Sequence, residues 1–305
     1  MTDTDITVAI TGPTRGLGLH AARALAARAP DAPLLLLGRD AGELAARQAE
    51  LRRRDVRTVR LDLADLASVH DAIAEIRTLV TDGVVPRLGA LVLNAGVQVS
   101  GRERSTSQGI ELTFGVNVVA QHALVVGMLD LLADDAHVVL VGSGTHFTDR
   151  SEVLVPHPRW ADPTELAEPG GGDADRAGQR AYATSKLAVV HLAHELHRRH
   201  GDQIRTNVYD PGLMPGTGLA RDLSALRRLL WFHVLPRLRL PGTSTPERSG
   251  AELADLALGR SHPDLRNGYV DIDRVADPSP ESFDVTRERR LWEVCLELGE
   301  RPAPV

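Results

Sequence analysis

The stretch Thr11-Gly12-Pro13-Thr14-Arg15-Gly16-Leu17-Gly18 decides the fold. It follows an apolar run at 6–11 with the pattern of a strand, and it precedes an Ala- and Leu-rich helix expected at 17–29. Glycines at such a place let the backbone approach a pyrophosphate, and the helix N-terminus offers unpaired N–H groups. The glycine spacing alone is weak evidence, but its position between strand and helix predicts a dinucleotide-binding loop. The residues expected to contact the cofactor here are Gly12, Thr14, Arg15, Gly16, Leu17 and Gly18.

The same alternation of strand and helix continues through the first 210 residues. Such repeats form βαβ units, and apolar runs without alternation indicate a sheet covered on both faces. The sequence therefore predicts an α/β doubly wound Rossmann fold, with a mostly parallel, seven-stranded sheet and helices on both faces. No linker divides the chain, so 1–305 is expected to be one domain. The expected strands after the first are 33–37, 56–61, 88–93, 137–141, 204–209 and 269–272, and the expected helices 41–54, 66–79, 108–132, 180–199, 246–258 and 285–298.

Two segments interrupt the alternation. The first is a proline-rich insertion at 144–179, which is longer than an ordinary connection and therefore either functional or disordered. The second, at 213–245, is expected to be a helical substrate lid. Its part 226–240 is basic and apolar and contains Trp231 and Phe232. A helix of that composition is also compatible with membrane-surface contact or with plain packing.

Composition excludes several classes of protein. Of the 305 residues, 43% are hydrophobic and 25% charged, which is ordinary for a soluble globular protein. The single cysteine, Cys295, excludes a disulfide scaffold and fits a reducing compartment. The net charge of -6 argues against a nucleic-acid partner. Neither a signal peptide nor an apolar run of about 20 residues is recognised, so a cytoplasmic protein is expected.

The end of the second strand bears on the choice of cofactor. The run at 34–37 is followed by Gly38-Arg39-Asp40. In dinucleotide-binding folds an acidic residue here selects NAD, whereas an arginine accommodates the additional phosphate of NADP. Arg39 together with Arg15 favours NADP(H). Asp40 is the dissenting residue, and it is interpreted as the start of the next helix.

Tyr182 and Lys186 form the strongest chemical signal. Residues four apart lie on one face of a helix. A free tyrosine titrates near pH 10, and a neighbouring ammonium favours the phenolate, which would suit Tyr182 to proton transfer. Lys186 is the only lysine in a chain with 35 Lys and Arg residues, so an ammonium is specifically retained there. Four histidines recur every third residue from His191 to His200, but this spacing spreads them over half the helix. We therefore expect them to lie on a polar or subunit-facing surface, and no metal site is predicted.

At this point the sequence resembles the short-chain dehydrogenase/reductase superfamily over about residues 6–215. The resemblance implies roles for residues at matching positions. Asp62, followed by Leu63, would bind the adenine, and Asn94-Ala95-Gly96 would pack on the cofactor. Asn117 would anchor a water in a proton relay, and Ser143 would hydrogen-bond the substrate oxygen. Pro211-Gly212 and Thr217 would contact the nicotinamide, and Lys186 its ribose.

Within the superfamily the chain looks closest to the retinol dehydrogenase and protochlorophyllide reductase-like branch. The segments that carry this likeness are 93–97, 111–117, 211–219 and 291–293. The catalytic helix has no cysteine after Lys186, which counts against pigment photoreduction. The resemblance also implies a homodimer or homotetramer through the helices at 108–132 and 180–199, unless the insertion covers that face.

These observations together predict an NADP(H)-dependent oxidoreductase that interconverts a carbonyl and an alcohol on a hydrophobic small molecule. Tyr182, Lys186, Ser143 and Asn117 are its expected catalytic residues. Two alternatives stay open: a C=C (enone) reductase with the same cofactor, and a non-catalytic NADP(H)-sensing protein. A protein that only senses the cofactor has no need to retain these four residues together.

Overall fold

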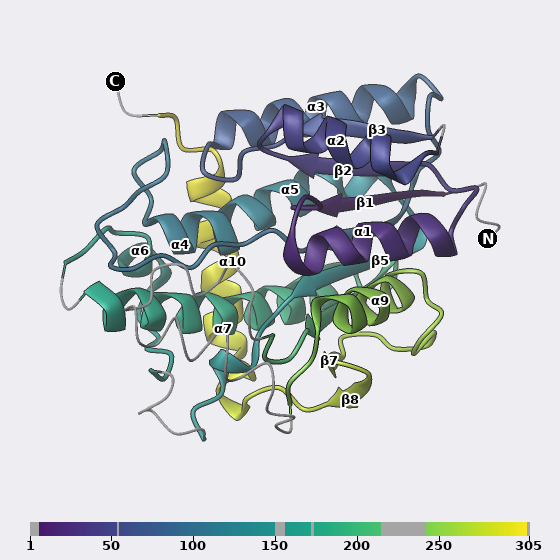
Figure 1. Cartoon of the computed structure of the whole chain (residues 1–305). Coiled ribbons are helices and arrows are strands. Elements are labelled where there is room, and N and C mark those ends of the chain that lie inside the picture. The colour runs from purple at the N-terminus through teal and green to yellow at the C-terminus, as the bar shows by residue number, and fades with distance from the viewer. Residues whose placement is uncertain (1–5, 54, 150–155, 172–173, 215–241, 304–305) are drawn as a thin grey trace.

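The computed structural model of the chain describes residues 6–53, 55–149, 156–171, 174–214 and 242–303. Figure 1 shows a central twisted sheet with helices packed on both of its faces. The architecture is therefore the α/β doubly wound Rossmann type that the alternation of strands and helices predicts.

The sheet has eight strands in the order β3-β2-β1-β4-β5-β6-β7-β8. All neighbouring pairs are parallel except β7 and β8, which form an antiparallel hairpin. The expected count of seven was one too few, because β8 is only three residues long and its sequence shows no usable alternation. The bounds are β1 Thr7–Thr11, β2 Leu34–Gly38, β3 Val56–Arg60, β4 Leu88–Leu93, β5 Leu132–Val141, β6 Ile204–Asp210, β7 Tyr269–Asp271 and β8 Arg274–Ala276.

Two groups of helices cover the two faces of the sheet. One face carries α1 (Gly16–Arg28), α2 (Ala41–Leu51) and α9 (Pro246–Ala257). The other carries α3 (Leu66–Thr81), α5 (Ala120–Met128), α7 (Ala174–His200) and the C-terminal α10 (Val285–Gly299), which lies across α5 and α7. The chain reverses its direction of winding between β1 and β4, and in open α/β sheets ligands bind at this switch point beyond the carboxyl ends of the strands.

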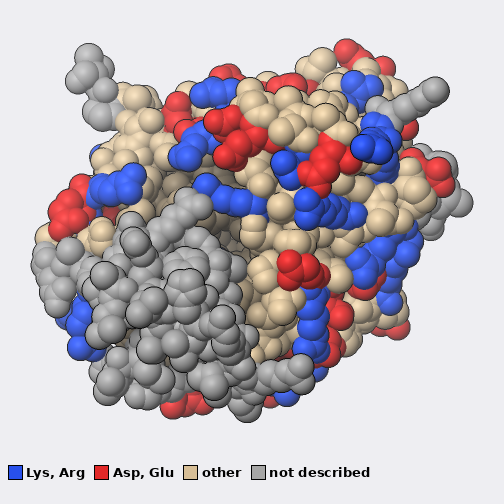
Figure 2. Space-filling view, in the orientation of Figure 1, with Lys and Arg blue, Asp and Glu red and all other residues tan. Residues whose placement is uncertain are grey.

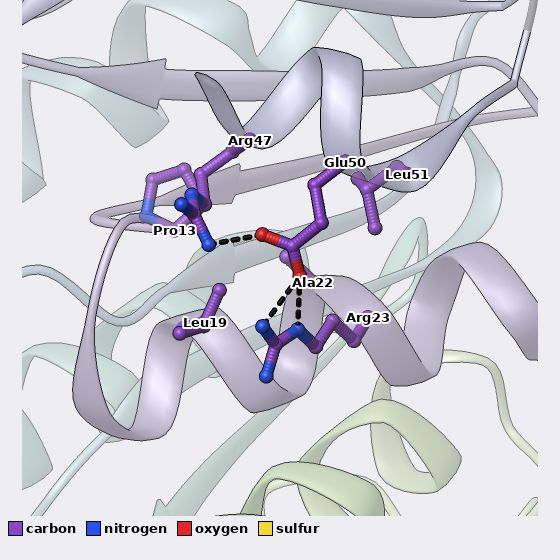
Figure 3. Close-up of a pocket in the computed structure, with 7 residues that line it drawn as sticks. All are labelled: Pro13, Leu19, Ala22, Arg23, Arg47, Glu50 and Leu51. Carbon is purple, nitrogen blue, oxygen red and sulfur yellow. Dashed lines mark hydrogen bonds and ion pairs between the residues drawn. The ribbon is translucent and has the colours of Figure 1, made fainter. Parts of the chain in front are cut away.

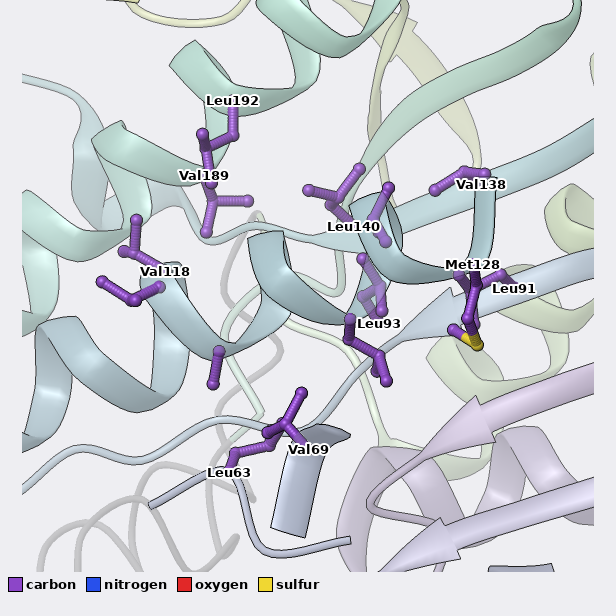
Figure 4. Close-up of a cluster of buried hydrophobic side chains, with 14 of the residues drawn as sticks. Leu63, Val69, Leu91, Leu93, Val118, Met128, Val138, Leu140, Val189 and Leu192 are labelled. Atoms are coloured by element: carbon purple, nitrogen blue, oxygen red, sulfur yellow. The ribbon is translucent and has the colours of Figure 1, made fainter. Parts of the chain in front are cut away.

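Apolar side chains fill both layers between sheet and helices. In β2, Leu35 and Leu37 belong to the core under α3, whereas Leu34 and Leu36 belong to the core under α1. Successive strand residues point to opposite faces, which is why this strand is apolar throughout. Figure 4 shows the larger core, where side chains from β4 and β5 meet those from the helices above them.

The helical run before β5 differs from the expected helix at 108–132. Glu111 caps the first turn by accepting a hydrogen bond from the Phe114 backbone N–H, so the run begins at α4 (Leu112–Phe114). A π-helical turn at Gly115–Val119 follows and leads into α5. Taken together, Leu112–Leu131 is long and apolar enough to cross a membrane by length and composition. No apolar segment of this length was recognised from the sequence. Most of this helix is buried in the larger core, as expected for the central helix of such a fold.

The insertion at 144–179 is partly regular structure. It contains a 3-10 turn at Gly144–His146, the short α6 (Pro163–Leu166) and the first turns of α7, which begins six residues before the expected helix at 180–199. An isolated bridge between Arg102 and Gly170 joins the insertion to the segment after β4. Of the expected lid at 213–245, residues 215–241 lie outside the described residues, as does the basic and apolar stretch 226–240.

Candidate active site

The glycine loop between β1 and α1 is held tightly against the end of β4. Gly12 has a positive φ of 65°, a conformation that side chains disfavour. A Cβ on Gly18 would lie 2.1 Å from the Gly12 carbonyl oxygen, so only glycine fits at 18. Asn94 Nδ2 donates to the carbonyl oxygens of Thr11 and Gly12, at 2.9 and 3.1 Å. Asn94 therefore fixes the shape of the predicted phosphate loop.

The N-terminus of α1 is open to an anion. Arg15 stands at the capping position, but no side chain accepts a hydrogen bond from the first turn, and that turn contains no acidic residue. The first N–H groups of a helix have no partner within it, and their partial positive charge suits a phosphate. Gly16 has a positive φ of 53°, and an added Cβ there would meet nothing within 4 Å. The space over this backbone fits a pyrophosphate.

Arg15 and Arg39 are both exposed, and neither guanidinium group has a hydrogen-bond or ion-pair partner within the part of the chain that the structure describes. Asp40 caps α2 by accepting a hydrogen bond from the Glu43 backbone N–H at 2.8 Å. Asp40 therefore begins α2, as the sequence predicts.

Two nearby arginines on α1 and α2 differ from this pair. Figure 3 shows a shallow pocket beside Pro13 in which Arg23 and Arg47 both contact the Glu50 carboxylate. Both guanidinium groups are thus paired with one carboxylate, unlike those of Arg15 and Arg39. On the face of the molecule seen in Figure 2, basic and acidic side chains are intermixed rather than gathered by sign.

Asp62 and Leu63 follow β3 at the same edge of the sheet. The Asp62 carboxylate accepts a hydrogen bond from the Ala64 backbone N–H at 3.0 Å and remains partly exposed. Leu63 is buried in the larger core. Their position beside the end of β2 is compatible with the predicted adenine contact.

The segment Asn94-Ala95-Gly96 ends β4 between the glycine loop and α7. The Ala95 backbone N–H donates to Thr11 Oγ1 at 2.9 Å, and the Ala95 carbonyl oxygen accepts from Gln121 Nε2 at 2.7 Å. A Cβ on Gly96 would lie 3.1 Å from Asn117 Oδ1 and 3.9 Å from Lys186 Nζ. Gly96 therefore brings the backbone close to the predicted catalytic residues.

Tyr182 and Lys186 lie on one face of α7, and both are buried. Lys186 Nζ lies 5.5 Å from the centre of the Tyr182 ring and donates a 2.7 Å hydrogen bond to the Val141 carbonyl oxygen at the end of β5. The structure thus places the two residues on one helix face, as the four-residue spacing predicts, and it brings them to the carboxyl edge of the sheet.

The electrostatics of this pair differ from the expectation. Burial raises the pKa of the Tyr182 phenol well above its usual value, and a hydrogen bond with the Ser143 side chain opposes that effect only in part. Burial also lowers the pKa of Lys186 to about 8, while the Asp210 carboxylate acts to raise it. The sequence predicted that Lys186 lowers the pKa of Tyr182. With the protein groups alone this pKa is raised instead, because desolvation of the buried phenol dominates.

Ser143 begins the 3-10 turn that follows β5. Its Oγ accepts hydrogen bonds from Thr145 N at 3.3 Å and from Thr145 Oγ1 at 3.2 Å. The same hydroxyl is the group that hydrogen-bonds Tyr182. The insertion therefore folds away after Ser143 and leaves it beside Tyr182, although the two are 39 positions apart in the sequence.

Asn117 lies in the π-helical turn and is almost fully buried. Its side chain accepts from the Val97 backbone N–H at 2.8 Å and donates to the Val97 carbonyl oxygen at 2.9 Å. Asn117 Nδ2 also donates to Ser185 Oγ at 3.0 Å, next to Lys186. Its side chain thus joins the end of β4 to α7.

The end of β6 supplies the remaining predicted contacts. Gly212 has a positive φ of 72°, and the Pro211 carbonyl oxygen accepts a 2.7 Å hydrogen bond from Ser249 Oγ. Thr217 lies outside the described residues. Asp210 was not predicted as a site residue from the sequence. It is buried and accepts hydrogen bonds from the Gly212 backbone N–H at 2.9 Å and from Tyr269 Oη at 2.7 Å. Its only sequence signal was a carboxylate next to Pro211-Gly212.

The histidines of α7 are not a metal site among the residues that the structure describes, where no group of three ligands gathers. His191 is fully buried, and its ring meets Trp160 edge-on at 4.6 Å. His194 is also buried, with Nδ1 at 3.2 Å from the Ser282 carbonyl oxygen. The expectation of a polar or subunit-facing surface was wrong for these two, because α10 and the insertion cover them.

The fold and this site define a dinucleotide-binding α/β oxidoreductase. A family model described as short chain dehydrogenase matches residues 6–154. Protochlorophyllide reductase B of Hordeum vulgare is 31% identical, with 95% of this chain and 77% of that protein aligned. Polyprenol dehydrogenase of Danio rerio is 29% identical, with 95% and 86% aligned. The chain belongs to the short-chain dehydrogenase/reductase family, and it is therefore an NAD(P)(H)-dependent oxidoreductase.

Solved structures share the fold of this chain. An uncharacterised protein from Mycobacterium paratuberculosis matches with a TM-score of 0.67 and 25% identity, over 100% of this chain and 99% of that one. A short chain dehydrogenase from Shigella flexneri, solved in complex with NADP, has the same fold, with a TM-score of 0.60 and 20% identity over 90% of this chain and 100% of that one.

Proposed function

We propose that the protein is an NADP(H)-dependent oxidoreductase that interconverts a carbonyl and an alcohol on a hydrophobic small molecule. The observation that carries this proposal is the convergence of Tyr182, Lys186 and Ser143 at one edge of the sheet. A phenol hydrogen-bonded to a serine hydroxyl, with an ammonium beside the ring, can deliver a proton to a substrate oxygen.

Each side chain has a defined task in the reduction. The cofactor, when bound, supplies the hydride. The Ser143 hydroxyl donates a hydrogen bond that polarises the substrate carbonyl, and Tyr182 donates its proton to the developing alkoxide. Burial keeps the Tyr182 phenol protonated until that transfer, which suits its role as the acid. In the oxidation the same group acts as the base.

Lys186 and Asn117 support Tyr182. The Lys186 ammonium stabilises the phenolate that forms as the proton leaves, and it binds the nicotinamide ribose. Asn117 holds Val97 and Ser185 in place around Lys186, and it lies on the path by which a proton returns to Tyr182. Both residues act on the proton, while the glycine loop, Asn94-Ala95-Gly96 and Pro211-Gly212 bind and orient the cofactor.

The preference for NADP(H) follows from charge. Arg15 and Arg39 flank the site where the adenosine ribose of the cofactor would lie, and both guanidinium groups have no partner among the described residues. Two such cations favour a ribose that carries a phosphate. The preference for a hydrophobic substrate rests on Leu213, which is 42% exposed just beyond Gly212, and on the neighbouring apolar Met214.

The test is NADPH oxidation, followed at 340 nm, over a panel of ketones, aldehydes and enones. We expect turnover of a carbonyl that is lost in Tyr182→Phe. Tyr209→Phe is the matched control, because Tyr209 is also buried but donates its hydroxyl to the Ser249 carbonyl oxygen, whereas Tyr182 is hydrogen-bonded to Ser143. Turnover retained in Tyr182→Phe would overturn the mechanism.

Product analysis separates the alternatives. An enone that loses its alkene and keeps its carbonyl would identify a C=C reductase. Tight NADPH binding with no turnover on any member of the panel would favour the cofactor-sensing protein. Comparing NADPH with NADH in the same assay tests the assigned cofactor, and an equal rate with both would contradict it.

A further inference from the structure

His146 is fully buried three residues after Ser143, and the reaction scheme above gives it no task. Its Nδ1 lies 2.7 Å from the Ser143 carbonyl oxygen. Its Nε2 accepts a 3.0 Å hydrogen bond from the Ser279 backbone N–H. Both ring nitrogens are therefore satisfied, one by the residue that touches the substrate in the proposed reaction and the other by the segment that precedes α10.

These two partners fix the state of the ring. A backbone N–H can only donate, so Nε2 carries no proton where it faces Ser279. The proton of the neutral imidazole then lies on Nδ1 and is donated to the Ser143 carbonyl oxygen. The ring has one tautomer and one orientation, and it is further held by the rings of Phe147 and Tyr269, with centroids at 4.3 and 5.2 Å.

Ser279 is itself well anchored. Its carbonyl oxygen accepts a 2.7 Å hydrogen bond from Ser282 Oγ, and its hydroxyl donates to the Glu281 carboxylate, which also accepts from Thr148 Oγ1. The Ser282 carbonyl oxygen lies against His194 of α7. The segment Ser279–Ser282 therefore connects the turn that carries Ser143 to the helix that carries Tyr182.

We propose that His146 is a positioning residue for the reaction: by holding the Ser143 carbonyl from a fixed point at Ser279, it sets the direction of the Ser143 hydroxyl toward Tyr182. The proposal rests on the proposed function, since Ser143 is taken to polarise the substrate. A hydrogen-bond donor must keep its place within about 0.5 Å to favour the transition state. Ser143 stands at the start of a single 3-10 turn, and the contact of His146 with the Ser143 carbonyl oxygen holds the backbone of that turn.

The first test is His146→Phe, which keeps an aromatic ring and removes both hydrogen bonds. We expect kcat to fall by about 10- to 100-fold while the Kd for NADPH changes by less than about twofold, because the two hydrogen bonds removed are made to Ser143 and Ser279, which are not among the residues assigned to the cofactor. His146→Asn retains an amide N–H close to the position of Nδ1 and is expected to recover most of the lost kcat. His191→Phe is the matched control, because His191 is equally buried but has no hydrogen-bond partner for either nitrogen among the described residues.

A double-mutant cycle separates positioning from general stability. In a Ser143→Ala background the direction of the hydroxyl no longer matters, so His146→Phe should cost no further kcat. An equal loss in both backgrounds would show a merely structural role and overturn the proposal. An unchanged kcat in His146→Phe, in an enzyme whose wild type is active, would also overturn the proposal.

A measurement without turnover keeps this inference distinct from the proposed function. In 15N NMR of the wild-type protein, the His146 ring should carry its proton on Nδ1 and none on Nε2. The opposite tautomer would overturn the positioning role even in an active enzyme. Absence of carbonyl turnover in the wild type would instead count against the proposed function, and the Nδ1 tautomer would then still report the contact with Ser143.

Discussion

Lys186 Nζ donates a 2.7 Å hydrogen bond to the carbonyl oxygen of Val141, two residues before Ser143. Val141 is the last residue of β5 and lies beside Tyr209 of β6 in the sheet. One contact thus connects the helix that carries Tyr182 to the strand that leads into Ser143. It sets the distance between the proton donor and the group that polarises the carbonyl, in addition to placing a positive charge at the site.

Replacing Lys186 by Arg tests this dual role, because the charge is kept and the shape is changed. The ammonium is buried and donates to the Val141 carbonyl oxygen, so the larger, planar guanidinium cannot keep this position without moving its neighbours. We expect kcat/KM to fall by about 100-fold or more, measured by steady-state NADPH oxidation. Activity within twofold of the wild type would show that charge alone is required.

Arg39→Ala should change the choice of cofactor. Loss of a charged hydrogen bond to phosphate costs about 1.5–3 kcal/mol, which corresponds to a fall of about 10- to 100-fold in kcat/KM for NADPH. The value for NADH should stay nearly constant, because it lacks the phosphate. Arg47→Ala is the control on α2, the helix that follows Arg39, since Arg47 is paired with Glu50. Equal losses with both cofactors would assign Arg39 a structural role.

Asp210→Asn should move the alkaline limb of the pH profile of reduction to lower pH. The Asp210 carboxylate raises the pKa of Lys186, which burial lowers to about 8, and it also raises the pKa of Tyr182. Without this charge both groups lose their protons at a lower pH, so the phenol and the ammonium that reduction needs are lost sooner. The profile of kcat/KM against pH measures this shift.

Tyr269→Phe is the control for Asp210→Asn. It removes the 2.7 Å hydrogen bond to the Asp210 carboxylate but leaves the negative charge in place. The alkaline limb should therefore stay close to its wild-type position. A shift of the same size in both variants would mean that the hydrogen bond, rather than the charge, governs the titration.

Local patterns in the sequence were sufficient to predict where most of the candidate site residues lie. The glycine loop, the Tyr182 and Lys186 spacing and the capping role of Asp40 depend on neighbours within a few residues, and the structure has each as predicted. These features are determined locally, so no tertiary contact was needed to infer them.

Other features depend on contacts between distant segments and were not predictable. The roles of Asp210 and His146 require Tyr269 and Ser279, which lie 59 and 133 positions away. The burial of His191 and His194 requires α10 to dock on α7. The raised pKa of Tyr182 depends on how completely the helix is covered, which no spacing in the sequence records.

Acid should destabilise the protein through its buried histidines. Burial and the charge of Arg199 lower the pKa of His122 to about 3, and burial lowers that of His191 to about 4. Above pH 6.5 both are neutral in the folded and unfolded states and contribute no pH dependence. Between about pH 6.5 and 4, His122 and His191 together bind about two protons in the unfolded chain that they do not bind in the folded protein. The free energy of unfolding therefore decreases as the pH is lowered through this range.

Urea unfolding at a series of pH values measures this slope. His122→Phe removes one of the two titrating groups. It should therefore reduce the slope of the free energy of unfolding against pH by about 1.4 kcal/mol per pH unit, the value for one proton. Phe suits the site because the surroundings of His122 include Val125, Leu140 and Trp292. Carboxylates with lowered pKa, such as Asp162 at about 2, act in a more acidic range. An unchanged slope would mean that His122 is protonated in the folded state.

The C-terminal helix should keep the protein monomeric, contrary to the homodimer or homotetramer that the resemblance implied. That assembly would use the faces of α5 and α7, across which α10 lies (Figure 1), with Leu291, Trp292 and Cys295 buried there. We expect light scattering after size exclusion to give the mass of one chain, 32.9 kDa. Trp292→Ala should lower the free energy of unfolding by about 3–5 kcal/mol and, by loosening α10, promote association that increases with concentration. A wild-type dimer whose cross-links map to α5 and α7 would contradict this prediction, because those faces cannot be buried by α10 and by a second copy at once.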